Sequence, residues 1–353
     1  MGIDIHELGE DMKARNGLLV SVLLVFTLIP SSMAQNKWEP EEIEDIFDGF
    51  DVSAAIARVE ARGVTPYDFG LDLLAAGQPE KAKLWFKNLA TSTRDLKYLY
   101  GLAWVLRRGG ENGKAQSAGK YILENEPTPL IRARVLYLLG AINLDERLLS
   151  EARENLQEGL KAYAALEKAG GQFVCLNKLA LLAILERKYD EVEGYLEEAL
   201  AMNDRVRAKG KTPYSLGPIY EVRGESLFGQ GDYDGALLMA IDSEKAYRED
   251  GEIEVADTFL AKIALLKLIT GKPSEARDTA ESLWDQFHDS PNHGRLIALN
   301  NIVVMKLFQC SEETEKSQKT ETSIRSWANS SPGGKAILEL MEIITGLPCP
   351  EWR

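Results

Sequence analysis

Apolar residues at helical spacing, interrupted by glycines, form a pattern that returns along most of the chain. The first copy contains Phe69, Gly70, Leu73, Gly77, Ala82 and Phe86. A later copy contains Gly224, Leu227, Gly231, Asp232, Tyr233 and Ala236. In both copies, apolar positions with helical spacing lie on either side of a glycine, Gly77 or Gly231. This pattern predicts two short helices joined by a tight turn at that glycine. One such pair cannot bury its apolar face alone, so the pattern predicts an all-α solenoid of stacked antiparallel helix pairs.

A small or apolar residue near the start of the second helix marks each copy. These residues are Ala82, Ala115, Ala152, Val192, Ala236 and Ala276. The pattern resembles the tetratricopeptide repeat (TPR) family, whose period is about 34 residues. The resemblance covers residues 64–290, about six repeats, and the later copies are longer, as in the long-helix variety expected of an exported bacterial TPR protein. It implies a right-handed superhelix whose concave wall binds another protein.

Two flanking segments lack the full repeat pattern. Residues 35–63 predict a short N-terminal helical lead, and residues 291–353 predict a C-terminal helical cap that covers the open end of the solenoid. Within the cap, apolar spacing predicts helices at 297–308, 324–328 and 336–344, with a polar stretch at 311–322 between the first two.

The N-terminal segment has the pattern of a secretory signal. An apolar run, Leu18–Ile29, follows Lys13 and Arg15. A helix of that length reaches only about 18 Å, which is too short for a hydrocarbon core about 30 Å thick. We therefore expect residues 1–34 to be a cleaved signal peptide, with no membrane span left after cleavage.

Small residues at the end of this segment predict the cleavage point. Ser32 and Ala34 occupy the two positions that a signal peptidase reads, so cleavage is expected between Ala34 and Gln35. Met12 is the expected true start, because the residues before it are acidic, unlike the start of a signal peptide. The expected location is the periplasm or the outside of the cell.

Export makes the three cysteines relevant, because an oxidising compartment allows thiols to pair. Cys310 and Cys349 both lie in the last part of the chain and are a candidate disulfide that would hold the C-terminal tail. Two unrelated buried thiols are the alternative, and the sequence leaves both open. Cys175 lies inside an apolar run and is expected to be a core residue.

In the TPR family, residues along one side of the first helix of each repeat line the concave groove, and we call these residues the stripe. Carried over to this chain, the stripe predicts a partner-binding groove formed by Tyr67, Leu71, Tyr98, Leu102, Tyr137, Asn177, Glu221 and Phe228. A tyrosine has a large apolar ring and a polar tip, so the three tyrosines are expected to anchor an amphipathic helix or an extended segment. Trp85 and Leu139 fall on the packing side in this register. Close packing of long helices, without a groove, is the alternative.

Charge and the remaining motifs narrow the function classes. A net charge of −14 argues against nucleic acid or an anionic membrane as a partner. His288 and His293 lie among turn residues, so no metal site is expected. The chain has no nucleophile elbow and no phosphate-binding loop, so we expect neither a catalytic residue nor a cofactor.

These observations predict an exported, non-catalytic scaffold or adaptor that holds a protein or peptide partner in an apolar, tyrosine-lined groove, in envelope assembly or secretion. A solenoid hydrolase or carbohydrate-acting protein of the envelope is one alternative. A ligand-sensing regulatory TPR protein is another. The sequence leaves the identity of the partner and the homo-oligomeric state open.

Overall fold

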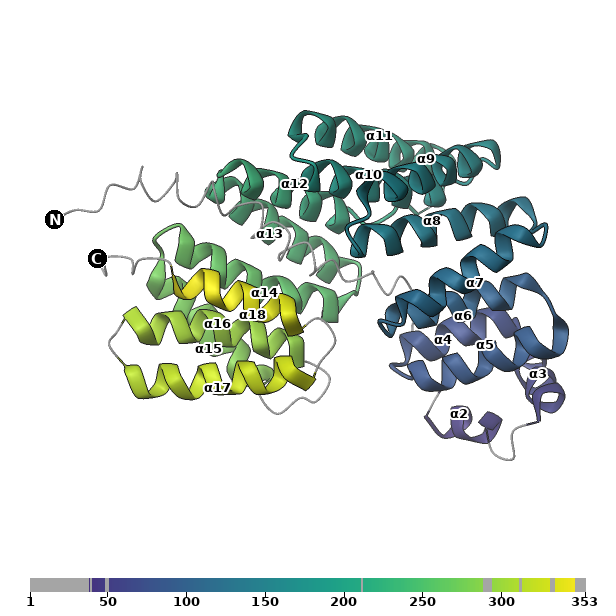
Figure 1. Cartoon of the computed structure of the whole chain (residues 1–353), viewed down its shortest axis with the longest axis horizontal. Coiled ribbons are helices and arrows are strands. Elements are labelled where there is room, and N and C mark those ends of the chain that lie inside the picture. The colour runs from purple at the N-terminus through teal and green to yellow at the C-terminus, as the bar shows by residue number, and fades with distance from the viewer. Residues whose placement is uncertain are drawn as a thin grey trace. The chain divides into compact units, whose positions relative to one another are not determined.

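The computed structural model of the chain describes residues 38, 40–47, 51–210, 212–287, 294–310, 313–330 and 334–346. All regular secondary structure in these residues is α-helical (Figure 1). The all-α prediction is therefore confirmed. The predicted signal peptide and its cleavage point lie outside the described residues.

The helices fall into two compact units, Ser31–Leu179 (the N-terminal unit) and one that contains Ala180–Arg353 (the C-terminal unit). The N-terminal unit contains α2 (Pro40–Phe47), α3 (Val52–Ala61), α4 (Pro66–Ala75), α5 (Pro79–Thr93), α6 (Leu96–Arg108), α7 (Asn112–Glu124), α8 (Pro129–Asp145), α9 (Leu149–Ala165) and the start of α10 (Ala169–Leu185). The C-terminal unit contains the end of α10, α11 (Tyr189–Ala208), α12 (Gly217–Gln230), α13 (Tyr233–Glu249), α14 (Ile253–Ile269), α15 (Pro273–Phe287), α16 (Gly294–Cys310), α17 (Thr314–Ser330) and α18 (Gly334–Thr345).

In the N-terminal unit, successive helices from α2 to α9 pack against one another. Helix α6 also contacts α4 and α8, the helices two places before and after it (Figure 1). The first helices of the pairs, α4, α6 and α8, therefore lie side by side in one layer. This is the arrangement of stacked antiparallel pairs that the sequence pattern predicts.

Two glycines of the pattern make room for one aromatic ring. Phe86, on α5, is fully buried. A Cβ atom added at Gly70 would lie 2.3 Å from the Phe86 ring, and one added at Gly101 would lie 2.4 Å from it. Both distances are far below van der Waals contact, so α4 and α6 can approach α5 only because these two positions lack side chains. The close packing of α4 and α6 on α5 therefore depends on glycine at positions 70 and 101 and on the ring of Phe86.

The turns between paired helices use the left-handed backbone region. Gly77 follows α4 with φ +68°, and no other atom lies within 4 Å of where its Cβ would be, so backbone conformation alone favours glycine there. The matching turns of later repeats place Arg147 (φ 63°) and Arg187 (φ 59°) in the same region. The fold therefore keeps the turn where the sequence loses its glycine, which explains why later copies match the pattern less well.

The C-terminal unit continues the same arrangement. Successive helices from α11 to α18 pack against one another, with the first helices α14, α16 and α18 also in contact. One expectation about the cap is wrong, because α17 is a single helix that includes most of the predicted polar stretch. Ser317, Ile324 and Ala328 are buried along one side of α17, and most of its other residues are exposed. The polar stretch is therefore the outer face of an amphipathic helix.

The two described cysteines, Cys175 and Cys310, differ in whether they form a disulfide. Cys310 is disulfide-bonded, whereas Cys175 is a free, fully buried residue, as expected for a core position. Cys349, the proposed partner of Cys310, lies outside the described residues.

Among the described residues, no helix is long and apolar enough to cross a membrane.

Candidate functional site

One cationic side chain in the N-terminal unit lies between two aromatic rings from neighbouring helices. The guanidinium carbon of Arg134, on α8, lies 5.6 Å from the ring centre of Tyr67 on α4 and 5.9 Å from that of Tyr100 on α6. Arg134 is half-buried. It forms no hydrogen bond or ion pair with any described residue. Its charge is therefore stabilised only by the two aromatic faces and by solvent.

Four tyrosines lie in this region, and three of them, Tyr67, Tyr100 and Tyr163, interact electrostatically with Arg134. Burial raises the pKa of Tyr67 and of Tyr137 to about 12, and it also raises the pKa of Tyr100 and Tyr163. The four phenols are thus neutral at physiological pH and keep their hydroxyl protons for donation. None of the four hydroxyls forms a hydrogen bond with a described residue. They are not among the enclosed polar atoms of the described chain either, so each reaches the surface.

Another arginine, Arg107 on α6, lies close to this region, but it has an acidic partner. The Arg107 guanidinium donates from Nε and Nη2 to Asp145 Oδ2 at 3.1 and 2.7 Å. It also lies 5.9 Å from the ring centre of Trp104, which in turn lies 6.2 Å from the ring centre of Tyr137. Asp145 balances the charge of Arg107, whereas Arg134 has no acidic partner within the described part of the chain.

We call Tyr67, Tyr100, Trp104, Arg134 and Tyr137 the tyrosine–arginine face. Its chemistry combines the half-buried rings of Tyr67 and Trp104 and the buried rings of Tyr100 and Tyr137 with neutral hydroxyls and one guanidinium without an acidic partner among the described residues. Such a face can accept an anionic group through charge-assisted hydrogen bonds, while its rings cover apolar parts of the same ligand.

The structure adds one tyrosine beside the predicted stripe. Tyr98 packs in the core cluster with Trp85 and Phe86, but exposure does not separate it from the other tyrosines, because Tyr98, Tyr100 and Tyr137 are 7%, 8% and 8% exposed. A groove shared by Tyr67, Tyr98 and Tyr137 therefore stays a prediction. Tyr100, which lies about 200° around the helix axis from Tyr98, is the tyrosine of α6 whose ring lies beside Arg134.

The other groove predictions in this unit fall on packed positions. Leu71 and Leu102 are half-buried against the core cluster, and Asn177 is buried on α10. Trp85 and Leu139 are buried, which confirms their assignment to the packing side. The repeat register does not predict Tyr100, Trp104 or Arg107 as site residues, although their spacing of four and then three residues places them on one side of α6. It does not predict Arg134 either.

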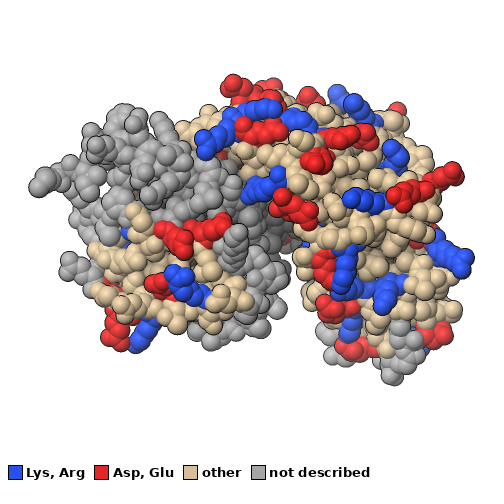
Figure 2. All heavy atoms as spheres, viewed as in Figure 1, with Lys and Arg blue, Asp and Glu red and all other residues tan. Residues whose placement is uncertain are grey.

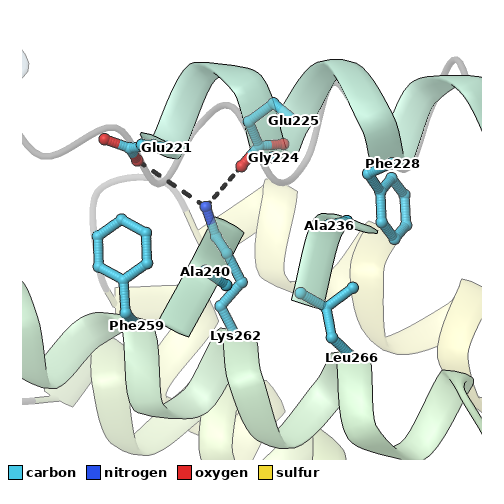
Figure 3. Close-up of a pocket in the computed structure, with 9 residues that line it drawn as sticks. All are labelled: Glu221, Gly224, Glu225, Phe228, Ala236, Ala240, Phe259, Lys262 and Leu266. Atoms are coloured by element: carbon cyan, nitrogen blue, oxygen red, sulfur yellow. Dashed lines mark hydrogen bonds and ion pairs between the residues drawn. The ribbon is translucent and has the colours of Figure 1, made fainter. Parts of the chain in front are cut away.

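Glu221 and Phe228, the groove predictions in the C-terminal unit, line a small pocket between α12, α13 and α14 (Figure 3). Lys262 Nζ lies 2.5 Å from Glu225 Oε1 and 3.8 Å from Glu221 Oε1. The Tyr247 hydroxyl donates to Glu221 at 3.3 Å. The cavity volume of about 10 Å³ is no more than the space for one water molecule. These two residues therefore belong to a buried charged cluster and do not face an open groove.

The ionisation of Lys262 reflects two opposing effects. Burial alone lowers its pKa, but the nearby carboxylates of Glu225 and Glu221 outweigh this and leave the pKa above its ordinary value of 10.5. Lys262 is therefore a cation at physiological pH. One oxygen of its partner, Glu225 Oε2, is enclosed without a hydrogen-bond partner.

Groups suited to catalysis or metal binding are sparse in the described chain. Within the described ranges, no cluster of three or more His, Cys, Asp or Glu side chains could hold a metal ion. His288 and His293 lie outside those ranges. Burial raises the pKa of Cys175 to about 12, so this thiol stays protonated and is a poor nucleophile.

No protein-family model and no curated protein sequence matches the chain. Among solved structures, NprR in complex with its cognate peptide NprX is 13% identical, with a TM-score of 0.57, over 96% of this chain and 94% of that chain. Rap protein complexed with Competence and Sporulation Factor is 11% identical, with a TM-score of 0.56, over 86% of this chain and 95% of that chain.

The Cut9–Hcn1 hetero-tetramer of APC/C is 17% identical, with a TM-score of 0.50, over 73% of this chain. The match spans 46% of the Cut9–Hcn1 chain, less than half of its length. Together with the stacked helix pairs, these likenesses show that the chain has the TPR-like α-solenoid fold.

Proposed function

We propose that this TPR-like chain is an exported, non-catalytic adaptor whose tyrosine–arginine face holds a partner segment that carries a carboxylate. The observation that carries the proposal is Arg134, a cation between the rings of Tyr67 and Tyr100 that pairs with no described carboxylate. A chain with 55 acidic and 41 basic residues offers ample carboxylates for its arginines. An arginine left without one is therefore open to a carboxylate from outside.

Physical chemistry favours a peptide segment as the bound group. A carboxylate on Arg134 would form charge-assisted hydrogen bonds, and the neutral hydroxyls beside it can donate further bonds. The rings of Tyr67 and Tyr100 offer apolar contact to neighbouring side chains of the same segment. Figure 2 shows acidic and basic side chains interspersed on the described part of the face in view, with no broad patch of one charge there.

The structural neighbours support a peptide as the partner class. NprR was solved with its cognate peptide NprX, and Rap was solved with Competence and Sporulation Factor. Both likenesses extend over most of the chain, including the N-terminal unit. By analogy, the face formed by α4, α6 and α8 is where we expect a partner segment.

Arg134→Gln is expected to weaken partner binding by about 10- to 100-fold, because a hydrogen bond to a charged group contributes about 1.5–3 kcal/mol. The probe is a phage-displayed random peptide library selected on the folded chain. The enriched peptides are then synthesised, and their affinities are measured by calorimetry. We expect the enriched peptides to carry Asp, Glu or a free terminal carboxylate.

Arg132→Gln is the matched control, since Arg132 lies on the same helix but is exposed and 4.0 Å from Glu158 at the surface. It should leave peptide affinity unchanged. Selection of peptides without acidic groups, or equal affinity for the wild-type chain and Arg134→Gln, would refute the proposed site.

Export is the second part of the proposal, and it is supported by the signal pattern of residues 1–34. In a bacterial host, the mature protein is expected to begin at Gln35 and to be recovered from the periplasm or the culture medium. N-terminal sequencing and cell fractionation measure this. A protein that retains its N-terminus and stays in the cytoplasm would contradict export and the envelope role that we propose with it, without affecting the peptide site.

A further inference from the structure

A cavity of about 380 Å³ lies between α15, α16 and α17 in the C-terminal unit and shares no lining residue with the sites described above. In Figure 1 these helices are neighbours, with α16 in contact with both of the others. The apolar wall is formed by Ala280, Val304, Leu307 and Phe308. Small-molecule pockets in proteins usually have volumes of about 300–1,000 Å³ and mostly apolar walls. This cavity has the size and lining of such a pocket.

One buried polar side chain in this cavity lacks a partner. Asn301 lines the cavity and is 4% exposed, yet its amide forms no hydrogen bond with any described residue. The preceding residue differs, because Asn300 Nδ2 donates to the Ala280 carbonyl at 2.8 Å and its Oδ1 is enclosed without a hydrogen-bond partner. The amide atoms of Asn301 are not among the enclosed polar atoms of the described chain, so they reach water in the cavity. A ligand in the cavity can replace that water and bond to Asn301.

The charged residues that line the cavity favour a single negative charge. Arg277, Glu281 and Lys319 give this lining one net positive charge. Lys319 lies 2.9 Å from Glu315, but both side chains are highly exposed, at 75% and 83%. Such a surface ion pair is weak, so the ammonium group of Lys319 can turn to a ligand at little cost.

From this geometry we infer that the cavity between α15, α16 and α17 binds a small organic monocarboxylate with an apolar body. The apolar body contacts Val304, Leu307 and Phe308. The carboxylate accepts a hydrogen bond from the amide of Asn301 and pairs with Lys319. This site is independent of the tyrosine–arginine face, so either can be wrong without affecting the other.

The test uses decanoate, 1-decanol and decylamine, which share one apolar chain and differ in the head group. Calorimetry on the full chain should show saturable binding of decanoate to one site, at least about tenfold tighter than binding of the other two. Hydrogen exchange should show that decanoate protects α16 and α17. Absence of saturable decanoate binding, equal affinity for the three probes, or protection elsewhere would overturn the inference.

Two variants separate the roles of the polar groups. Asn301→Leu and Lys319→Gln should each weaken decanoate binding by about tenfold, as expected for loss of a hydrogen bond to a charged group. Lys245→Gln is the control, because Lys245 is 71% exposed and, like Lys319, pairs with a Glu one helical turn away. Lys245→Gln should leave the affinity for decanoate unchanged. If Asn301→Leu does not fold, Lys319→Gln and the exchange map still decide, and unaltered affinity of Lys319→Gln would overturn the carboxylate assignment.

Discussion

Replacing Lys262 by methionine is expected to lower the free energy of unfolding by about 3–5 kcal/mol, because it leaves buried carboxylates without their cation. Glu225 is 3% exposed and Glu221 is 7% exposed, so bulk water solvates neither carboxylate well. Glu221 keeps the Tyr247 hydroxyl as a donor, whereas Glu225 already has one enclosed oxygen without a hydrogen bond. Most of the loss should therefore arise at Glu225.

Chemical denaturation of the full chain, followed by circular dichroism, measures this effect. The double variant Lys262→Met and Glu225→Leu should recover most of the lost stability, because apolar residues of similar volume often replace a buried ion pair at little cost. Lys272→Met is the control, since Lys272 pairs with Asp234 at the surface and its loss should cost less than about 1 kcal/mol. Equal stability of Lys262→Met and the wild-type chain would show that the cluster is not desolvated.

The pH dependence follows from the same cluster. The pKa of Lys262 is raised above its ordinary 10.5 in the folded chain, so the folded state binds this proton more tightly than the unfolded state does. Its contribution to stability is complete below the ordinary pKa and is lost as pH rises through the folded pKa. The difference in stability between the wild-type chain and Lys262→Met should therefore be constant near neutral pH and decrease only in strongly alkaline solution.

Phe86→Ala is the second change with a large expected effect, a loss of about 3–5 kcal/mol. Its ring fills the space beside both Gly70 and Gly101. The cost combines the lost burial of the ring with the cavity that remains between α4, α5 and α6. Thermal or chemical denaturation measures it.

A second substitution tests the packing explanation directly. Gly101→Ala should destabilise the wild-type chain by about 1–3 kcal/mol through overpacking, since the added Cβ would lie 2.4 Å from the Phe86 ring. In the Phe86→Ala background, the same change should instead stabilise the chain by about 0.5–1 kcal/mol, because alanine favours helix. Gly194→Ala, at a helical position with no atom near the added Cβ, should stabilise both backgrounds alike. Destabilisation by Gly101→Ala in both backgrounds would refute the role of the ring.

Local sequence signals were sufficient for most of the helix pairs. Gly77 followed by Pro79 predicts the turn between α4 and α5, and the helix begins at Pro79 in the structure. The glycine at Gly231 likewise ends α12 in the left-handed region, with Asp232 capping α13. These signals act between residues close in sequence, so they can be read without knowledge of the fold.

The same signals failed where rotation about a helix axis matters. The repeat register selects Tyr98 of α6, and only the packing of helices shows that both Tyr98 and Tyr100 are buried and that Tyr100 is the one beside Arg134. Most residues of α17 are polar and only a narrow side of the helix is buried, so the apolar pattern did not predict its full length. A helix with few apolar residues depends on its neighbours for stability, which a local pattern does not describe.

The sequence by itself determined that this protein is an array of helix pairs, because helical periodicity, turn glycines and helix caps are interactions within a few residues. Only the tertiary structure decided which side chains meet. Arg134 lies between Tyr67 and Tyr100, and Asn301 lines a cavity shared by three helices. Each successive residue turns the side chain by about 100° around the helix axis, and packing between neighbouring helices alone fixes that rotation. The binding chemistry of this chain is therefore a property of its helix contacts.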